Sequence, residues 1–283
     1  MTIGVEWTAP SAGKPSTGRL VLVHGFTQTR ASWTAIGASL AGDGYEVVSV
    51  DAPGHGESAA VQVDFVAGAD LLGRATGPAT YIGYSMGGRM ALHLAVSRPE
   101  LVERLVLVSS TAGIADDRER AARRATDEQR AASIERDGVA AFLADWLSLP
   151  LFANLPPDAA RLDDRLGNTA AGLASSLRLA GTGAQQSLWP TLESLAMPVL
   201  LVTGQLDAKF TAIAERMAAL IPDAVVEIIA GAGHVVHLER PAEFLEVLRR
   251  WLDATPVGPA GGTSADPPAE QQSERRQRAE RQL

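Results

Sequence analysis

Hydrophobic and polar positions form an alternating series of blocks over the first part of the chain. Short runs of consecutive apolar residues are separated by longer stretches whose apolar positions recur at helical spacing. Such short runs are typical of strands buried on both faces of a parallel sheet. The strands are predicted at residues 3–7, 20–23, 46–50, 79–83 and 105–109, and the helices between them at residues 32–41, 61–74 and 86–96. Alternating strands and helices predict an α/β protein with a mostly parallel sheet flanked by helices.

The alternation stops after residue 112 and resumes near residue 188. The intervening residues are charged and rich in Ala, and they predict helices at residues 116–136, 139–148, 158–166 and 172–179. Beyond them, strands are predicted at residues 199–203 and 225–229, and helices at residues 211–220 and 241–252. We therefore predict a core made of residues 1–112 and 188–253, interrupted by a helical cap at residues 113–187. Residues 254–283 contain four Pro, three Gly and no aromatic residue, so we expect a disordered tail there.

Composition limits the classes of function. The chain has 283 residues and no cysteine, so it can build one sizeable domain without disulfides. Its formal net charge of −8 argues against a nucleic-acid-binding surface, although a local group of arginines could still hold a small anion. No apolar stretch reaches the roughly 18 residues that a membrane span needs, and the N-terminus lacks the pattern of a secretion signal. We expect a cytoplasmic protein, and both a monomer and a homo-oligomer remain open.

The stretch Gly83-Tyr84-Ser85-Met86-Gly87 has the G-x-S-x-G pattern of a nucleophile elbow. It lies between a predicted strand and a predicted helix, which is the context that such an elbow requires. Glycines on both sides keep side chains out of the tight turn, so that the serine hydroxyl stands clear of the sheet. An ordinary glycine-rich turn would share the pattern, and the assignment therefore depends on finding partners for Ser85.

Asp207 and His234 are the candidate partners. Each follows a predicted strand, so both are expected at the sheet edge that carries Ser85. A serine hydroxyl reacts at neutral pH only when an imidazole takes its proton and a carboxylate orients the imidazole. The backbone N–H groups of Met86 and Phe26 would then form an oxyanion hole. Taken singly, Asp207 could instead cap the following helix, and His234 could be an ordinary loop histidine.

Other acidic and imidazole side chains fit structural roles better. Asp51 lies in a loop with Pro and Gly, where capping of a turn is expected. His24 directly precedes Gly25-Phe26 and is expected to brace the oxyanion loop. His93 is eight residues beyond Ser85 on the same predicted helix, too far along it to reach the chemistry. His237 lies on the segment that leads away from His234.

Together these motifs resemble the α/β-hydrolase fold. Within that superfamily, further segments resemble the 2-succinyl-6-hydroxy-2,4-cyclohexadiene-1-carboxylate synthase family, over about residues 18–252. The segments that carry this likeness are Gly83-Tyr84-Ser85-Met86-Gly87-Gly88-Arg89, Glu119-Arg120-Ala121-Ala122-Arg123, Ala144-Asp145-Trp146, Pro150-Leu151-Phe152, Arg165 with Asn168, residues 183–189 and Asp207-Ala208-Lys209-Phe210. The tail lies outside the resemblance.

The resemblance implies a lyase of menaquinone biosynthesis that eliminates pyruvate from a small anionic cyclohexene carboxylate. It implies that Arg89, Arg123 and Arg165 bind the substrate carboxylates, with Tyr84 and Trp146 lining the cavity. Guanidinium groups suit this task because they match a carboxylate bidentately. No metal or organic cofactor is implied, since the sequence has no clustered metal-ligand spacing and no phosphate-binding glycine loop.

Two other functions remain open at this point. A serine hydrolase, either an esterase or a C–C bond hydrolase, would share the triad and the cap. A non-catalytic small-molecule-binding protein could also use the same scaffold. The cap residues have structural alternatives too, because Arg123 belongs to an arginine-rich run that could face solvent, Arg165 follows Asp163 and Asp164, and Trp146 could be a packing residue.

Overall fold

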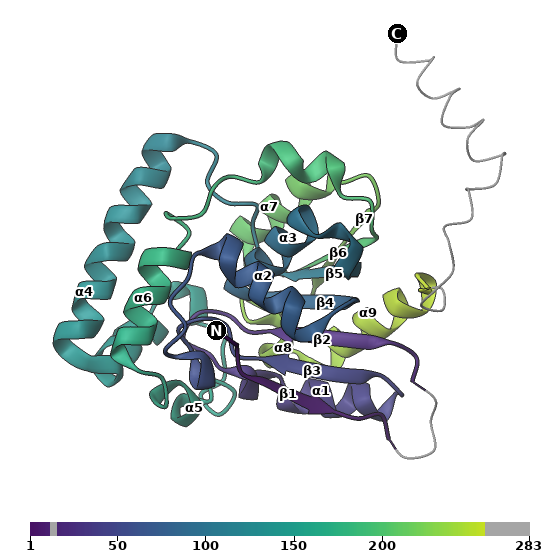
Figure 1. Cartoon of the computed structure of the whole chain (residues 1–283), viewed down its shortest axis with the longest axis horizontal. Helices are drawn as coiled ribbons and strands as arrows, with labels where there is room; N and C mark the ends of the chain where they lie inside the picture. The colour runs from purple at the N-terminus through teal and green to yellow at the C-terminus, as the bar shows by residue number, and fades with distance from the viewer. Residues whose placement is uncertain (12–15, 258–283) are drawn as a thin grey trace, which may run out of the picture.

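The computed structural model describes residues 1–11 and 16–257, which form a central sheet with helices on both faces and a helical group beyond one edge (Figure 1). The strand order is β1-β3-β2-β4-β5-β6-β7, and only β1 pairs antiparallel with its neighbour. The strands are β1 (Val5–Thr8), β2 (Arg19–Val23), β3 (Glu46–Val50), β4 (Ala79–Tyr84), β5 (Val102–Val108), β6 (Val199–Gly204) and β7 (Ala224–Ile229). The α/β fold with a mostly parallel sheet, as predicted from the alternation, is confirmed.

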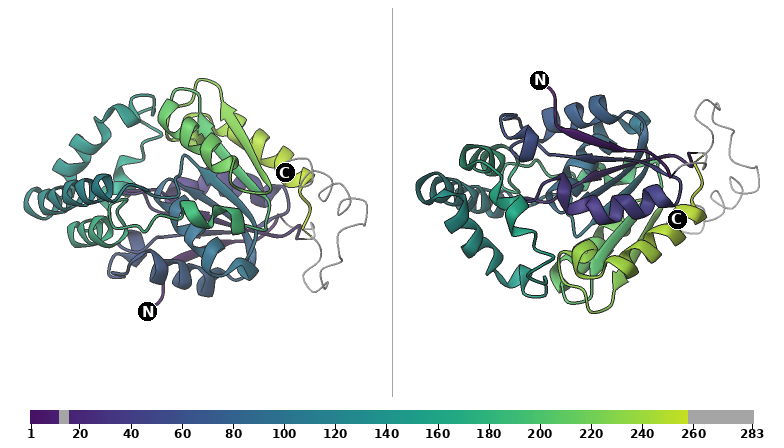
Figure 2. Two further views of the ribbon diagram at one scale, coloured as in Figure 1. Left: turned by 90° about the horizontal axis from the view of Figure 1, so that it is seen from above. Right: turned by 90° about the horizontal axis from the view of Figure 1, so that it is seen from below.

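The parallel strands are continuous apolar runs because both faces of the sheet are covered. On β2, Val21 and Val23 face one hydrophobic cluster, whereas Leu20 and Leu22 face the other. Figure 2 shows the helical layers on the two sides of the sheet. One layer contains α2 (Phe65–Thr76), α3 (Met86–Ser97) and α7 (Ala208–Ala218), and the other contains α1 (Thr34–Gly42), α8 (Val236–Glu239) and α9 (Pro241–Ala254).

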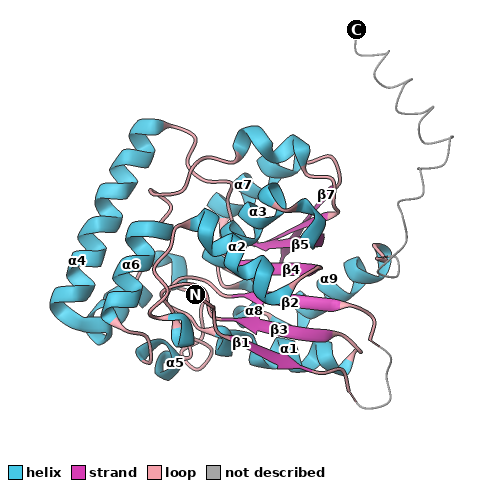
Figure 3. Ribbon diagram, viewed as in Figure 1, coloured by secondary structure: helices cyan, strands magenta, loops and turns pink. Residues whose placement is uncertain are grey.

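The helical group lies between β5 and β6 in the chain and is shown with the other helices in Figure 3. It contains α4 (Asp117–Leu147), α5 (Leu162–Leu166) and α6 (Ala170–Ala180). The helices predicted at residues 116–136 and 139–148 are the two arms of α4, which is interrupted at Gly138, where φ is 83°. Because glycine lacks a Cβ, it adopts this conformation without the steric penalty of other residues. The division of the chain into a core and a cap at residues 113–187 stays a prediction.

Short 3₁₀ helices join several of these elements. They are η1 (Arg30–Trp33), η2 (Gly56–Ser58), η3 (Pro99–Leu101), η4 (Pro150–Phe152) and η5 (Trp189–Ser194). The helix predicted from residue 61 begins at Phe65 instead, because the side chain of Asp64 caps it by accepting a hydrogen bond from the N–H of Ala67 at 2.9 Å. The helix predicted at residues 158–166 is reduced to α5, which begins only after Arg161, a residue in the left-handed region.

The C-terminal end of the described chain follows α9. This helix ends at Ala254, and residues 258–283 of the predicted tail lie outside the described residues. No helix within the described part of the chain is both long enough and apolar enough to cross a membrane.

Candidate active site

Ser85 lies on a strained turn at the carboxyl-terminal ends of the parallel strands, near the middle of the sheet. It follows β4 directly and precedes α3, and its φ of 49° and ψ of −105° are unusual for a residue with a side chain. The turn is tight enough that a Cβ on Gly83 would come within 2.5 Å of the Gly87 backbone. The strand-turn-helix geometry therefore needs its glycines and leaves the Ser85 hydroxyl projecting from the sheet edge.

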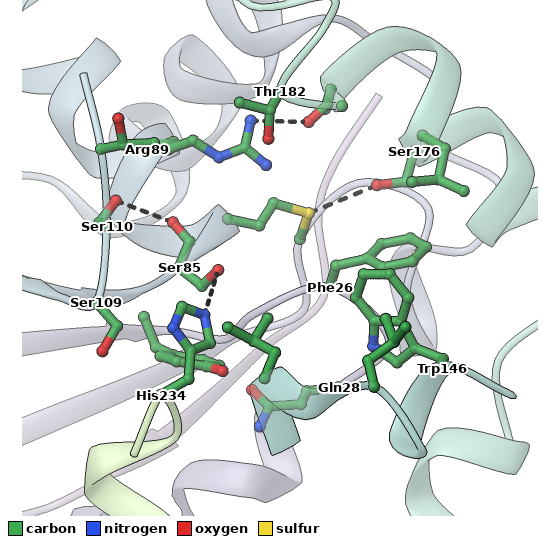
Figure 4. A pocket seen from close by; sticks show the side chains of 18 of the residues that line it. Phe26, Gln28, Ser85, Arg89, Ser109, Ser110, Trp146, Ser176, Thr182 and His234 are labelled. Carbon is green, nitrogen blue, oxygen red and sulfur yellow. Dashed lines mark hydrogen bonds between the residues drawn. The ribbon is translucent and has the colours of Figure 1, made fainter. Parts of the chain in front are cut away.

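His234 connects Ser85 to Asp207 (Figure 4 shows the Ser85–His234 contact). Its Nε2 lies 3.4 Å from Ser85 Oγ, and its Nδ1 lies 2.6 Å from Asp207 Oδ2. The imidazole is buried, so the carboxylate fixes it as the tautomer with a proton on Nδ1, leaving Nε2 able to accept the serine proton. Asp207 also caps α7, because its Oδ1 accepts a hydrogen bond from the N–H of Phe210 at 3.3 Å. The capping alternative and the triad geometry are thus compatible.

The loop after β2 presents the second half of the expected oxyanion hole. Among the described residues, the backbone N–H groups of Phe26 and Met86 donate to no protein acceptor, so both remain available to a ligand oxygen. The loop is held by Thr27, whose φ of 69° lies in the left-handed region. Thr27 donates its N–H to His55 Nε2 at 3.2 Å, and its carbonyl accepts from Asn168 Nδ2 at 2.8 Å.

Buried histidines hold this loop in place by hydrogen bonds to its backbone. His24 Nδ1 donates to the carbonyl of Gly25 at 2.8 Å, and its Nε2 accepts from the N–H of Ala52 at 3.0 Å. Burial lowers the pKa of His24 to about 4 and the pKa of His55 to about 3, so both rings stay neutral at neutral pH. Asp51 accepts hydrogen bonds from the backbone N–H groups of Arg30 at 2.8 Å and Glu57 at 3.1 Å, which is a turn-capping arrangement.

A cavity of about 210 Å³ opens above Ser85, between the sheet edge and the helical group. All five residues that the resemblance assigns to substrate line it, namely Tyr84, Arg89, Arg123, Trp146 and Arg165. Phe26, Ser85, Met86 and His234 line the same cavity. The structure therefore brings the sequence-predicted residues to one place, apart from Asp207, which lies behind the imidazole.

Arg89 is nearly buried and has no carboxylate partner in the described chain. Its guanidinium donates to the carbonyl of Ala180 and to Gln185 Oε1, each at 3.2 Å, and lies 4.7 Å from the centre of the Phe65 ring. Burial, together with the positive charge of Arg123, lowers the pKa of Arg89. A buried cation whose hydrogen-bond acceptors are all uncharged favours an anionic ligand.

Arg123 and Arg165, the two arginines from the helical group, differ in their surroundings. Arg165 is buried and donates to the carbonyl of Ala160 at 2.7 Å and to Thr27 Oγ1, so it pairs with neither of the preceding aspartates. Asp164 instead forms an ion pair with Arg161 at 2.5 Å. Arg123 is only partly exposed and donates from Nε to Asp127 at 2.8 Å. Neither arginine therefore lies on a fully solvated face.

Comparisons with known proteins identify the family of this chain. The family model described as "Alpha/beta hydrolase family" matches residues 20–247. The chain is 34% identical over 243 residues, covering 82% of this chain and 93% of the relative, to 2-succinyl-6-hydroxy-2,4-cyclohexadiene-1-carboxylate synthase of Klebsiella pneumoniae (strain 342). A Bacillus subtilis protein that carries the same enzyme name as a provisional assignment is 37% identical over 265 residues, covering 88% of this chain and 95% of that protein. The chain belongs to the α/β-hydrolase family, in the branch of these synthases.

Two solved structures place this α/β-hydrolase among its structural relatives. The structure of MenH from S. aureus superimposes with a TM-score of 0.84 at 32% sequence identity, covering 90% of this chain and 99% of that chain. A thermophilic esterase from Thermogutta terrifontis, solved with malate bound, has a TM-score of 0.74 at 25% identity, covering 90% of this chain and 94% of that one. The family likeness from the sequence motifs is thus confirmed.

The sequence reasoning missed two cations of this α/β-hydrolase cavity. Arg130 and Lys209 also line it, whereas no Asp or Glu of the described residues does. Arg130 lies seven residues beyond Arg123, a spacing that places both on one helical face and could have drawn attention to it. Lys209 follows Asp207 by two residues. Within residues 1–11 and 16–257, no group of three potential metal ligands is found, and a cofactor-free site stays a prediction.

Proposed function

We propose that the chain is a 2-succinyl-6-hydroxy-2,4-cyclohexadiene-1-carboxylate synthase. The reaction is elimination of pyruvate from 2-succinyl-5-enolpyruvyl-6-hydroxy-3-cyclohexene-1-carboxylate. The observation that carries the proposal is a serine elbow beneath a cavity lined by Arg89, Arg123, Arg130, Arg165 and Lys209, with no acidic side chain in the described wall. A substrate with a ring carboxylate, a succinyl carboxylate and an enolpyruvyl carboxylate is the kind of anion that such a wall attracts.

In the proposed mechanism, Ser85 acts as a base and no acyl-enzyme forms. His234 Nε2 takes the hydroxyl proton while Ser85 Oγ removes the ring proton beside the succinyl ketone. The electrons of the broken C–H bond shift through the ring, a new ring double bond forms, and the C–O bond to the enolpyruvyl group breaks. The released enolpyruvate takes up a proton on carbon and becomes pyruvate. Asp207 stabilises the imidazolium that forms transiently.

The oxyanion loop has a matching task in this elimination. As the ring proton leaves, negative charge develops on the oxygen of the succinyl ketone, which becomes enolate-like. The backbone N–H groups of Phe26 and Met86 would donate to that oxygen, and donors fixed before the reaction stabilise developing charge without reorganisation. Arg89, Arg123 and Arg165 bind carboxylates, while the side chains of Tyr84 and Trp146 shape the cavity.

The deciding experiment supplies the purified chain with the enolpyruvyl substrate and follows pyruvate with a lactate dehydrogenase assay. Release of pyruvate together with the cyclohexadiene chromophore is the expected result. A correctly folded protein that releases no pyruvate overturns the proposal. The expected cytoplasmic location and the oligomeric state stay predictions.

A serine hydrolase is the second candidate, because the same Ser85–His234–Asp207 geometry serves ester hydrolysis. It predicts that p-nitrophenyl esters are turned over as well as the enolpyruvyl substrate and that Arg89→Ala leaves ester turnover unchanged. The lyase predicts that pyruvate release is far faster than ester hydrolysis and depends on Arg89. A non-catalytic binding protein predicts ligand binding without either reaction.

A further inference from the structure

We propose that Arg130 and Arg123 act together as a single carboxylate-binding site, and that the buried Asp127 positions both guanidinium groups. The identity of the ligand rests on the proposed function, whereas the site itself rests on the structure. The three residues follow one another at intervals of four and three positions along α4, which places them on one helical face. Both arginines line the cavity above Ser85.

Asp127 is fixed from two directions. Its Oδ1 accepts a hydrogen bond from Arg123 Nε at 2.8 Å and lies 3.8 Å from Arg130 Nη1. Its Oδ2 accepts from the backbone N–H of Gly183 at 3.2 Å, and its side chain is only 2% exposed. One buried carboxylate thus serves two guanidinium groups, and the trio keeps one positive charge in excess.

The free edges of the two guanidinium groups are available to a ligand. Arg123 uses only Nε toward Asp127, and within the described residues its two terminal nitrogens have no acceptor. Arg130 lies 5.3 Å from the centre of the Trp146 ring. A guanidinium on an aromatic face can still donate in its own plane, which is the geometry that a carboxylate needs.

The electrostatics of the pair also favour an anion. Burial lowers the pKa of Arg130, and the positive charge of Arg123 lowers it further. Two cations that repel each other while sharing one carboxylate gain stability when a second carboxylate arrives. Asp127 therefore orients the pair without saturating its charge.

The arrangement of the cavity arginines, leaving Lys209 aside, matches the number of carboxylates on the proposed substrate. Arg89 and Arg165 are each held separately, by acceptors that carry no charge: Ala180 O and Gln185 Oε1 for the first, Ala160 O and Thr27 Oγ1 for the second. The pair on α4 makes a third site. Each of the three substrate carboxylates would then have one site, and Arg130 would be a specificity-determining residue for one of them.

The first test is the kinetics of Arg130→Met, which keeps most of the aliphatic length over Trp146 but removes the charge. KM for the enolpyruvyl substrate should rise roughly 10- to 100-fold, because one charge-assisted hydrogen bond to the substrate is lost. The change in kcat should be much smaller. Arg130→Lys should give an intermediate KM because the charge is retained. Arg124→Met is the matched control, since Arg124 is exposed on the same helix and does not line the cavity.

The second test uses three substrate analogues, each with one carboxylate replaced by a carboxamide. The KM penalty of Arg130→Met should vanish with one analogue and persist with the other two. Asp127→Asn should raise KM and lose its penalty with that same analogue, a pattern that a general loss of stability would not produce. Equal penalties on all three analogues, or an equal effect of Arg124→Met, would overturn the proposal.

A binding measurement separates this inference from the proposed function. If the wild-type chain releases no pyruvate, the lyase assignment fails, and calorimetry with tricarballylate, a simple tricarboxylate, still probes the pair. Weaker binding to Arg130→Met than to Arg124→Met would support the carboxylate site. Equal binding to both variants would contradict it.

Discussion

His234 Nε2 lies 3.4 Å from Ser85 Oγ, longer than the usual distance for a strong hydrogen bond to a hydroxyl. On its other side, the same ring lies only 2.6 Å from Asp207 Oδ2. The imidazole is therefore oriented by the carboxylate before any ligand binds, and the Ser85 contact has room to shorten when substrate fills the cavity. Catalysis then depends on the hydroxyl and on the orientation of the ring as separate contributions.

Ser85→Ala should separate turnover from binding. Removing the hydroxyl eliminates the proposed base, so kcat for pyruvate release should fall by about 10⁴-fold or more, by analogy with loss of a triad member in serine enzymes. The affinity for the ring product, measured by calorimetry, should stay within about threefold, because the cavity arginines are untouched. Ser97→Ala, at the far end of the same helix, serves as the control. Retained turnover would mean that His234 removes the ring proton without the serine.

Asp207→Asn should reduce kcat by about 10⁴-fold while the fold is preserved. The amide can donate to Nδ1 and so favours the tautomer with the proton on Nε2, which cannot accept from Ser85. The change is measured by pyruvate release across neutral pH. Asp223→Asn, an exposed residue just before β7, should leave the rate unchanged. A loss smaller than tenfold would show that Asp207 mainly caps α7.

Arg89→Lys should raise KM by roughly tenfold or more, with a smaller change in kcat. Lysine keeps the charge but cannot present the guanidinium fork, nor reach both Ala180 O and Gln185 Oε1 in the same plane. The measurement is the substrate dependence of pyruvate release. The control is Arg98→Lys, because Arg98 is partly exposed just beyond the end of α3 and pairs with Glu100. An unchanged KM would remove Arg89 from the substrate site.

Much of the fold follows from local signals in the sequence. Buried parallel strands such as β2 and β4 are runs of apolar residues that only a doubly covered sheet accommodates. The end of each strand then fixes where the next residue projects, so Ser85, Asp207 and His234 could be expected at one sheet edge. Their approach through the 2.6 Å and 3.4 Å contacts agrees with that expectation, while their catalytic roles await the assays above.

The cavity wall was harder to predict because it depends on how α4 is rotated and placed against the sheet. Arg130 is one of several arginines on α4, and its seven-residue spacing from Arg123 puts it on the same helical face without showing that this face meets the cavity. Arg165 contacts Thr27 across 138 residues of sequence, a pairing that no spacing rule reveals. Long-range packing of the helical group thus decides which cations reach the cavity, whereas local periodicity decides only that α4 is a helix.

Buried neutral histidines should make the protein sensitive to acid. His237 is fully buried, stacks on Trp33 at 4.1 Å between ring centres, and has no hydrogen-bond partner for either ring nitrogen in the described chain. Burial, and then the charge of Arg165 and the neighbouring ring of His234, lower its pKa from 6.5 to about 3. His24, His55 and His93 have similarly lowered pKa values of about 4, 3 and 4. Below pH 6.5 the unfolded chain binds protons that the folded protein does not, so stability falls as pH decreases toward these values.

His237→Phe should reduce that acid sensitivity. Each such histidine lowers the free energy of unfolding by up to about 1.4 kcal/mol per pH unit below about pH 6.5. Phenylalanine removes one titrating group and keeps the aromatic contacts with Trp33 and Tyr84. Urea unfolding of both proteins between about pH 7.5 and about pH 4.5 gives the two slopes. The variant should be at least as stable as wild type at neutral pH, since it no longer buries two unpaired nitrogens, and its curve should be shallower below pH 6.5. Parallel curves would mean that His237 is protonated or hydrated in the folded protein, and the neutral-ring account of this core would then be wrong.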